Sequence, residues 1–263
     1  MDDPMILKVR DVVKHYGGLC AVDGASLDVP RQAVVALIGP NGCGKTSLLN
    51  TIYGMQQADE GNIYFEGESI DELAPHEIFQ RGMVHAFQFP RLFLQLSVLD
   101  NMILAARGNS GDGFWNSLLH RKRWQHEEEA IYQRAMEVLE LMELTRLAHS
   151  PASELSGGQK KLLEMSRAFL AEPRLLLLDE PAAGVNPVLA KKVFDKIEYF
   201  RRKGMTFLVI EHRMELLMEY AHWVYVMDRG KIVLEGRPVD VAANPLFYEI
   251  YIGGDGDAHL PGQ

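Results

Sequence analysis

Apolar residues follow two different periods along the chain. Before about residue 90, and again after residue 156, short apolar runs either alternate with polar residues or are apolar throughout, which is typical of β-strands. Between about residues 90 and 155 the apolar positions recur instead at helical spacing. The pattern predicts an α/β fold with an inserted α-helical subdomain.

The segment before residue 90 is expected to open with antiparallel strands at residues 6–13 and 25–29, joined through a turn at Tyr16, Gly17 and Gly18. This predicts an N-terminal antiparallel β subdomain ahead of the α/β core. We expect further strands at residues 33–38, 61–67, 82–87, 175–178, 206–210, 223–227 and 231–234, and helices at 160–171, 187–203 and 214–220.

One long helix is predicted in the helical segment. Its apolar face is marked by Ile131, Ala135, Val138, Leu139 and Met142. Glutamates at positions 127–129 predict that the helix begins just before them, because carboxylates in a first turn face the positive end of the helix dipole. We expect three parts: a core of residues 1–89 and 156–235, a helical subdomain at 90–155, and a C-terminal extension at 236–263.

Residues 39–46 read Gly-Pro-Asn-Gly-Cys-Gly-Lys-Thr and match the phosphate-binding pattern GxxxxGK[ST]. A predicted strand before this loop and a predicted helix after it favour a nucleoside-triphosphate site over a glycine-rich turn without a ligand. Lys45 would reach the outer phosphates, and Thr46 would offer its hydroxyl to Mg²⁺. The predicted nucleotide contacts are Gly39, Pro40, Asn41, Gly42, Cys43, Gly44, Lys45, Thr46 and Ser47.

Two carboxylates follow a run of four leucines at residues 175–178. Such a run is typical of a central parallel strand that is buried on both faces. Asp179 and Glu180 come at its C-terminal end, where ligands gather in open α/β sheets. The two carboxylates could simply form a solvated acidic turn, but the phosphate loop favours a role in the nucleotide site. We expect Asp179 to hold Mg²⁺ through its water shell and Glu180 to polarise a water aimed at the γ-phosphate.

A third motif, Ser156-Gly157-Gly158-Gln159, precedes a predicted helix. Ser156 can N-cap this helix, and the two glycines leave backbone N–H groups uncovered at its positive end. This predicts a second anion site. Helix capping alone would account for the serine and the glycines, but we expect that it does not require Gln159.

The order of these motifs resembles that of the nucleotide-binding subunit of ATP-binding cassette (ABC) transporters over nearly the whole chain. The resemblance implies a RecA-like core of the P-loop NTPase class that binds ATP and Mg²⁺. It also implies that residues 156–159 are the family signature, which closes over the ATP held by a second ATPase subunit.

Further positions receive roles from this resemblance. Tyr16 corresponds to the aromatic residue that stacks on adenine, and Gln88 to the glutamine that connects the metal site with the helical subdomain. His212 corresponds to the histidine that contacts the γ-phosphate, and Asn186 ends a loop that crosses the dimer interface, where many relatives carry Asp. The implied catalytic residues are Lys45, Gln88, Glu180 and His212, and the implied metal contacts are Thr46, Gln88 and Asp179.

The sequence resembles the ATPase subunits of branched-chain amino-acid importers in three places. These are residues 180–187, the end of the core, and an extra stretch at 107–123. Related importers of urea, short amides and neutral amino acids share this pattern. The implied partners are permease subunits and, indirectly, a substrate-binding protein, at the cytoplasmic side of the cell membrane. The alternatives are the ATPase of a lipopolysaccharide exporter, which should lack the extra stretch, and a soluble ABC ATPase that acts on ribosomes or DNA.

Composition narrows these alternatives. The formal net charge of −9 argues against a nucleic-acid partner. No apolar run approaches the roughly 18 residues that span a bilayer, and the N-terminus lacks the apolar region of a signal peptide. Membrane association is therefore expected only through a partner. Two cysteines give no disulfide framework, as expected in a reducing compartment.

Two local features of the sequence each have two possible explanations. Residues 114–124 combine an apolar helical face with basic residues, which indicates either contact with the permease or lipid, or packing on the helical subdomain. Cys43 lies two residues before Lys45, and we expect the lysine and the helix N-terminus to lower the pKa of its thiol and make it reactive. The alternative is a small buried cysteine that fills the loop.

Overall fold

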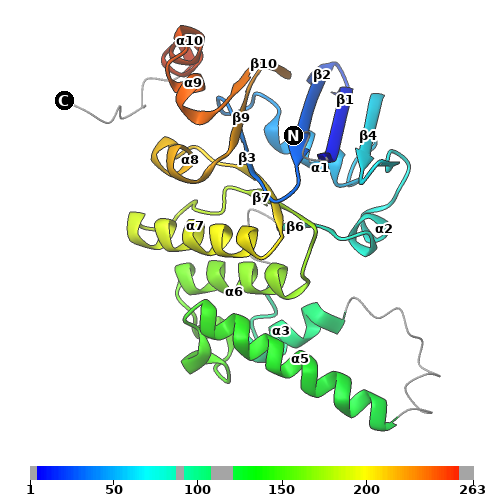
Figure 1. The fold of residues 1–263 in the computed structure, drawn as a ribbon, viewed down its shortest axis with the longest axis vertical. Helices are drawn as coiled ribbons and strands as arrows, with labels where there is room; N and C mark the ends of the chain where they lie inside the picture. The colour runs from blue at the N-terminus through cyan, green and yellow to red at the C-terminus, as the bar shows by residue number, and fades with distance from the viewer. Residues whose placement is uncertain (1–4, 87–91, 108–120, 255–263) are drawn as a thin grey trace. The chain divides into compact units, whose positions relative to one another are not determined.

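The structure is a computed structural model that describes residues 5–86, 92–107 and 121–254 (Figure 1). The chain divides into two compact units, each with many contacts within itself. The sheet unit consists of Met1–His85, Arg174–Pro181 and Ile197–Gln263, and the helical unit consists of Ala86–Pro173 and Ala182–Lys196. The domain boundaries expected from the sequence stay a prediction, because compactness does not show which segments fold independently.

The sheet unit contains two β-sheets. The first is antiparallel, with the strand order β2-β1-β4-β5, and the second has the order β10-β9-β3-β8-β7-β6. In the second sheet β3 pairs in parallel with both β8 and β9, whereas β10 runs antiparallel to β9. The mixed α/β fold class predicted from the sequence is confirmed. The strands are β1 Met5–Tyr16, β2 Leu19–Pro30, β3 Val34–Ile38, β4 Glu60–Phe65, β5 Glu68–Ser69, β6 Met83–Ala86, β7 Leu175–Asp179, β8 Thr206–Ile210, β9 Trp223–Asp228 and β10 Lys231–Gly236.

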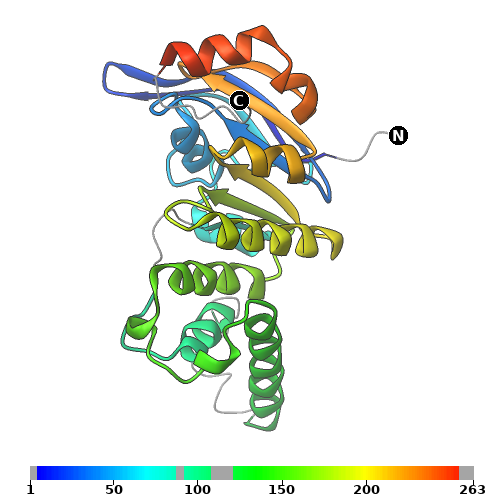
Figure 2. The same cartoon turned by 90° about the vertical axis from the view of Figure 1, so that its left-hand side faces the viewer.

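Strand β3 is buried on both faces, which explains its uninterrupted apolar sequence. Val35 and Leu37 pack in a core cluster with apolar residues of α1 and of the first sheet. Ala36 and Ile38 face the other side, because side chains alternate along a strand, and pack in a cluster with α8, α9 and α10 (Figure 2). The helices of this unit are α1 Lys45–Ile52, α2 Pro75–Gln80, α8 Met214–Tyr220, α9 Pro238–Ala242 and α10 Pro245–Gly254.

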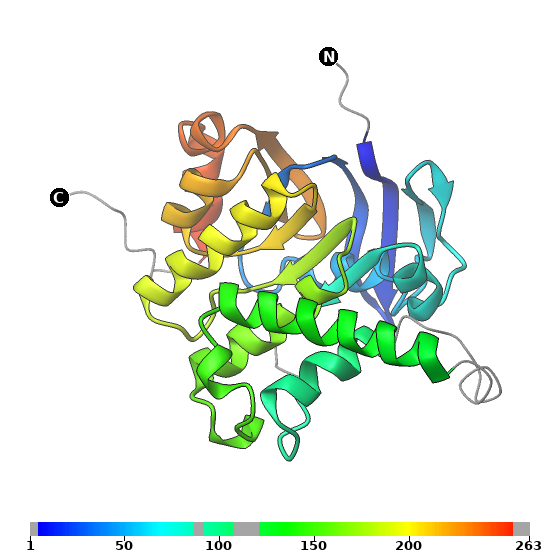
Figure 3. The same ribbon diagram turned by 60° about the horizontal axis from the view of Figure 1, so that its bottom comes forward.

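The helical unit is built from α3, α5 and α6, which pack against one another, and from the first part of α7 (Figure 3). Ala135 and Leu139 of α5 and the following Met142 are buried, as the predicted apolar face requires, while Ile131 and Val138 are half-buried. The helices are α3 Val98–Arg107, α5 Arg121–Leu141, α6 Gly157–Leu170 and α7 Pro187–Arg202, with 3₁₀ turns at Thr145–Leu147 and Ala152–Glu154.

The predicted start of the long helix is wrong. Helix α5 begins at Arg121, so the glutamates at 127–129 lie beyond its first turn, which contains no acidic residue. Glutamate is a good helix former at interior positions, so a run of glutamates indicates a helix without marking its first turn.

Across the described residues, every helix is too short or too polar to cross a lipid bilayer.

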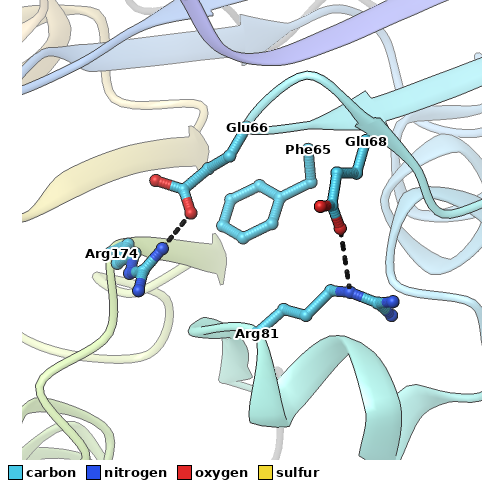
Figure 4. Close-up of a pocket in the computed structure, with 5 residues that line it drawn as sticks. All are labelled: Phe65, Glu66, Glu68, Arg81 and Arg174. Carbon is cyan, nitrogen blue, oxygen red and sulfur yellow. Dashed lines mark hydrogen bonds and ion pairs between the residues drawn. The ribbon is translucent and has the colours of Figure 1, made fainter.

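A polar pocket lies beside the turn between β4 and β5 (Figure 4). Glu66 pairs there with Arg174 and with Arg31, whose Nη2 lies 2.6 Å from Oε1 of Glu66. Arg31 precedes β3 and Arg174 precedes β7, so these ion pairs connect the first sheet with the second. The residues that line the pocket are Phe65, Glu66, Glu68, Arg81 and Arg174.

The Glu66 ion pairs should make stability depend on pH. Partial burial raises the pKa of Glu66, but the hydrogen bonds and charges of Arg31 and Arg174 outweigh it, so the pKa lies below its ordinary value of 4.5. A lowered pKa stabilises the fold above the unfolded-state value, and this contribution is lost as the pH falls through the folded-state value. We expect Glu66→Gln to lower the free energy of unfolding by up to about 1 kcal/mol at pH 7.

Urea unfolding at pH 7 and at steps below pH 4.5 measures this difference, which should shrink towards acid. Glu68→Gln is the matched control, because Glu68 is exposed and its Oε2 lies 3.7 Å from Nε of Arg81. If Glu66→Gln lowers the free energy of unfolding by the same amount at every pH, the stabilisation does not come from the charge of Glu66.

Candidate functional site

The phosphate loop connects β3 to α1, and two of its glycines are fixed by the approach of other backbone segments. Gly39 has a φ of 151°, and a Cβ there would lie 2.0 Å from the carbonyl oxygen of Met227. Gly44 has a φ of 111°, and a Cβ there would lie 2.2 Å from the carbonyl oxygen of Ala21. The backbone N–H of Gly230 donates to the carbonyl of Cys43 at 2.8 Å. Glycine is therefore required at positions 39 and 44, both because φ is positive there and because the neighbouring backbone leaves no room for a Cβ.

Lys45, the first residue of α1, lies inside this loop. Its side chain is buried, and Nζ donates to the carbonyl oxygens of Gly39 and Pro40, each at 2.8 Å. No side chain caps α1 at Gly44. The loop thus combines a buried ammonium with the N–H groups of a helix N-terminus, which suits a phosphate chain.

Thr46 and Asp179 bring two oxygen ligands together. Thr46 Oγ1 donates to Oδ2 of Asp179 at 3.1 Å, and Asp179 is buried at the C-terminal end of β7. A hydroxyl and a carboxylate are the hard donors that Mg²⁺ accepts, and one or two such side chains are usual where phosphates supply further ligands. Among the described residues no three or more His, Cys, Asp or Glu side chains cluster so that they could hold a metal ion.

Glu180 and His212 face one another across the ends of β7 and β8. His212 Nε2 lies 2.9 Å from Oε1 of Glu180. Glu180 has a φ of 50°, a conformation that L-residues rarely adopt, and its N–H donates to the carbonyl of Ile210 at 2.9 Å. Strained backbone of this kind is common at catalytic sites, where it fixes the direction of a side chain. Here it directs a carboxylate that a histidine also holds.

The described structure therefore brings together most of the predicted site. The whole loop from Gly39 to Ser47, the Thr46–Asp179 pair and the Glu180–His212 pair all belong to the sheet unit. Tyr16 belongs to the same unit, at the end of β1. Gln88 and residues 108–120 of the extra stretch at 107–123 lie outside the described residues, so the roles predicted for them stay predictions.

The signature residues belong to the helical unit, where they begin α6. Ser156 is its N-cap: Oγ accepts from the N–H of Gln159 at 3.3 Å, and the N–H of Ser156 donates to Oε1 of Gln159 at 2.8 Å. The expectation that capping does not require Gln159 is therefore wrong, because this reciprocal capping box uses both side chains. A Cβ at Gly158 would lie 2.5 Å from Leu189, whereas Gly157 has open space.

The prediction for Cys43 is also wrong. The residue is buried, and burial raises the pKa of its thiol above the ordinary value of 9.0. Lys45, whose Nζ lies 3.8 Å from the sulfur, lowers the pKa by less than burial raises it. Cys43 is thus a small buried side chain that fills the loop, which is the alternative considered from the sequence.

Asn186 has a structural role that the motif comparison missed. Its Oδ1 accepts from the N–H of Leu189 at 2.9 Å, so it caps α7 ahead of Pro187. The signal was present in the sequence, because Asn followed by Pro is typical of a helix start.

The chain is similar to known proteins over most of its length. The family "ABC transporter" matches residues 22–183. The chain is 41% identical over 258 residues to the "Probable branched-chain amino acid transport ATP-binding protein LivG" of Methanocaldococcus jannaschii, covering 96% of this chain and 100% of the relative. It is 33% identical over 254 residues to the "High-affinity branched-chain amino acid transport ATP-binding protein LivG" of Escherichia coli K12, covering 96% and 99%.

A solved structure is similar over the same extent. The crystal structure of the ADP conformation of an ATP-binding cassette of an ABC transporter superposes with a TM-score of 0.83 at 40% identity, covering 95% of this chain and 99% of that one. A nucleotide-free cassette from an ABC transporter gives a TM-score of 0.82 at 40% identity, covering 95% and 100%.

The backbone contacts of the loop predict unequal effects of two alanine substitutions. Gly42→Ala meets no atom within 4 Å, so it should cost only the backbone strain of its φ of 78°, about 1–2 kcal/mol. Gly44→Ala adds the collision with the Ala21 carbonyl, for a total of about 2–5 kcal/mol. Chemical denaturation of the two variants measures the difference. Equal losses would show that the contact between the loop and β2 does not constrain the fold.

Proposed function

The chain belongs to the ABC transporter family, whose ATP-binding cassettes hydrolyse ATP, and from this premise we propose that it drives the import of branched-chain amino acids. The observation that carries the proposal is the extent of the similarity. Relatives named for branched-chain amino acid transport, in an archaeon and in a bacterium, each align over 96% of this chain. Similarity limited to the nucleotide site would support ATP hydrolysis but would not indicate which class of substrate is transported.

The arrangement of Lys45, Glu180 and His212 supports a mechanism for ATP hydrolysis. Water attacks the γ-phosphorus, the bond to the β-phosphate oxygen breaks, and ADP leaves. Glu180 orients the water and accepts its proton, and His212 keeps the carboxylate in place from 2.9 Å. Lys45 stabilises negative charge on the outer phosphates. Positioning and charge account for the catalysis, because phosphoryl transfer requires little covalent chemistry from the protein.

Magnesium fits this arrangement. Thr46 and Asp179 would hold the ion, directly or through water, and the bound ion would neutralise charge on the phosphate oxygens. Gln88 is a further ligand by resemblance.

A second copy, or a closely similar ATPase subunit, would complete the site. Ser156, Gly157 and Gly158 stand at the N-terminus of the 14-residue helix α6, where uncovered N–H groups suit an anion. In this proposal they bind the phosphates of ATP held by the other subunit. Two nucleotides are then buried in a closed dimer, and hydrolysis releases it.

The permease contact is proposed at the start of the helical unit. Phe93 and Leu94 are large, apolar and exposed, on a loop that Asn101 holds. Asn101 is fully buried and exchanges hydrogen bonds with Phe93 in both directions, through Oδ1 at 2.9 Å and Nδ2 at 3.0 Å. A rigid loop with exposed apolar side chains suits a protein interface. The chain would then lie on the cytoplasmic face of the membrane, held by its permease, while a separate binding protein delivers the substrate.

Transport in a reconstituted complex tests the substrate class. The chain would be co-expressed with permease subunits from its own source organism, reconstituted into proteoliposomes containing Mg-ATP, and supplied with a binding protein from the same source. We expect uptake of leucine, isoleucine and valine, and its loss with Lys45→Ala. Uptake of urea or short amides instead would overturn the proposed substrate class while keeping the import function, and ATP-driven movement of lipid in the opposite direction would overturn import.

Two substitutions should separate binding from hydrolysis. Lys45→Ala should severely weaken nucleotide binding, because the loop loses its buried cation. Glu180→Gln should leave the Kd for Mg-ATP nearly unchanged and lower kcat by about 10²–10⁴-fold, as expected on removal of a general base. Isothermal titration and phosphate release measure the two quantities, with Glu68→Gln as a control carboxylate outside the site. Wild-type kcat in Glu180→Gln would remove this residue from the mechanism.

A further inference from the structure

Tyr16 stands at the tip of a hairpin that has little support of its own. It pairs with Leu19 across the turn, and both side chains are substantially exposed, at 40% and 65%. A Cβ built at Gly17 or Gly18 meets no atom within 4 Å, so the space beside both glycines of the turn is open. A residue in this position has a fixed direction only if something outside the hairpin holds it.

The segment that follows α1 supplies that support. The backbone pairing of β1 with β4 ends at Val13 and Glu60, and the N–H of Asp59 donates to the carbonyl of Val13 at 2.8 Å. Beyond this point β1 continues for three residues towards the turn. Side chains from residues 56–59 replace β4 as its neighbours there.

Asp59 binds both residues that precede Tyr16. Its Oδ1 accepts from Nζ of Lys14 at 2.8 Å, and its Oδ2 accepts from the backbone N–H of His15 at 2.5 Å. The ring nitrogen Nδ1 of His15 lies 3.2 Å from the same Oδ2. Lys14 also donates to the carbonyl of Gln57 at 2.8 Å. The carboxylate therefore fixes the backbone one residue before Tyr16.

Gln56 binds Tyr16 itself. The phenolic O–H donates to Oε1 of Gln56, so the far end of the ring is held as well as its backbone. The hydrogen bond from Lys14 and the N–H of His15 lower the pKa of Asp59 to about 2, so its carboxylate stays ionised at every pH near neutrality.

We propose that Gln56 and Asp59 are positioning residues that set the Tyr16 ring in the orientation in which it meets the base of bound ATP. The inference rests on the proposed function and on the contact between Tyr16 and adenine that the family resemblance implies. Residues 56–59 follow α1 closely, and α1 begins in the phosphate loop. One helix is thereby connected at its start to the phosphate contacts and, just past its end, to the base contact. Holding the ring before the nucleotide arrives reduces the entropy lost on binding.

The test compares ligands with and without a base. Stacking of a base on an aromatic ring contributes to the free energy of nucleotide binding. Tyr16→Ala removes this contribution and should raise the KM for ATP about tenfold. Asp59→Ala should raise it about three- to tenfold, and Gln56→Ala less, with kcat changed less than twofold. The Kd for inorganic tripolyphosphate, which has no base, should not change in any of the three.

A double-mutant cycle separates positioning from general destabilisation. In a Tyr16→Ala background, Asp59→Ala should have no further effect on the KM for ATP, because the group that it positions is gone. Asp28→Ala is the matched control, since it removes the ion pair with Arg10 on the same two strands away from the turn. It should leave the KM unchanged.

The outcomes distinguish the adenine contact of Tyr16 from the positioning role of Gln56 and Asp59. If Tyr16→Ala leaves the KM for ATP unchanged, the proposed adenine contact fails and the positioning role fails with it. If Tyr16→Ala raises the KM but Asp59→Ala does not, or if the two effects are additive, the positioning role alone is overturned. A loss of tripolyphosphate binding in Asp59→Ala would also overturn it, since that result would show damage to the phosphate loop.

Discussion

Backbone packed directly against backbone is the constraint on which this site depends. The phosphate loop is held on one side by the carbonyl of Met227 at the end of β9, and on the other by the carbonyl of Ala21 in β2. Each contact leaves no room for a Cβ. Because β9 belongs to the second sheet and β2 to the first, the loop is also a place where the two sheets meet, and its geometry is set by both.

The charged groups of the site are held in place by an apolar sheet. β3, β7 and β8 are buried along their whole lengths, so polar groups appear only where the strands end. The loop begins at the end of β3, Asp179 ends β7, and His212 follows β8 by two residues. Parallel pairing of β3 with β8 and of β7 with β8 brings these ends to one edge. Fixed charges in this arrangement need little reorganisation during the reaction.

Motifs with local geometry could be predicted from the sequence, and contacts between distant segments that belong to no motif could not. The loop, the leucine strand β7 and the strand β8 follow from their own residues, and they lie where the pattern placed them. The pKa of Cys43 could not be predicted, because it depends on how deeply the folded loop buries the sulfur. The contact of Asp59 with His15 joins residues 44 positions apart in sequence, and no short motif encodes it.

The strained backbone of Glu180 has a consequence for how this protein responds to selection. A left-handed conformation costs an ordinary residue about 1–2 kcal/mol and costs glycine or asparagine less. Several residues of the described chain share such a conformation, but in the proposed mechanism residue 180 is the one whose carboxylate orients the attacking water. Under that mechanism, laboratory evolution for heat resistance alone would favour glycine or asparagine at residue 180, and would yield a more stable cassette at the expense of ATP hydrolysis.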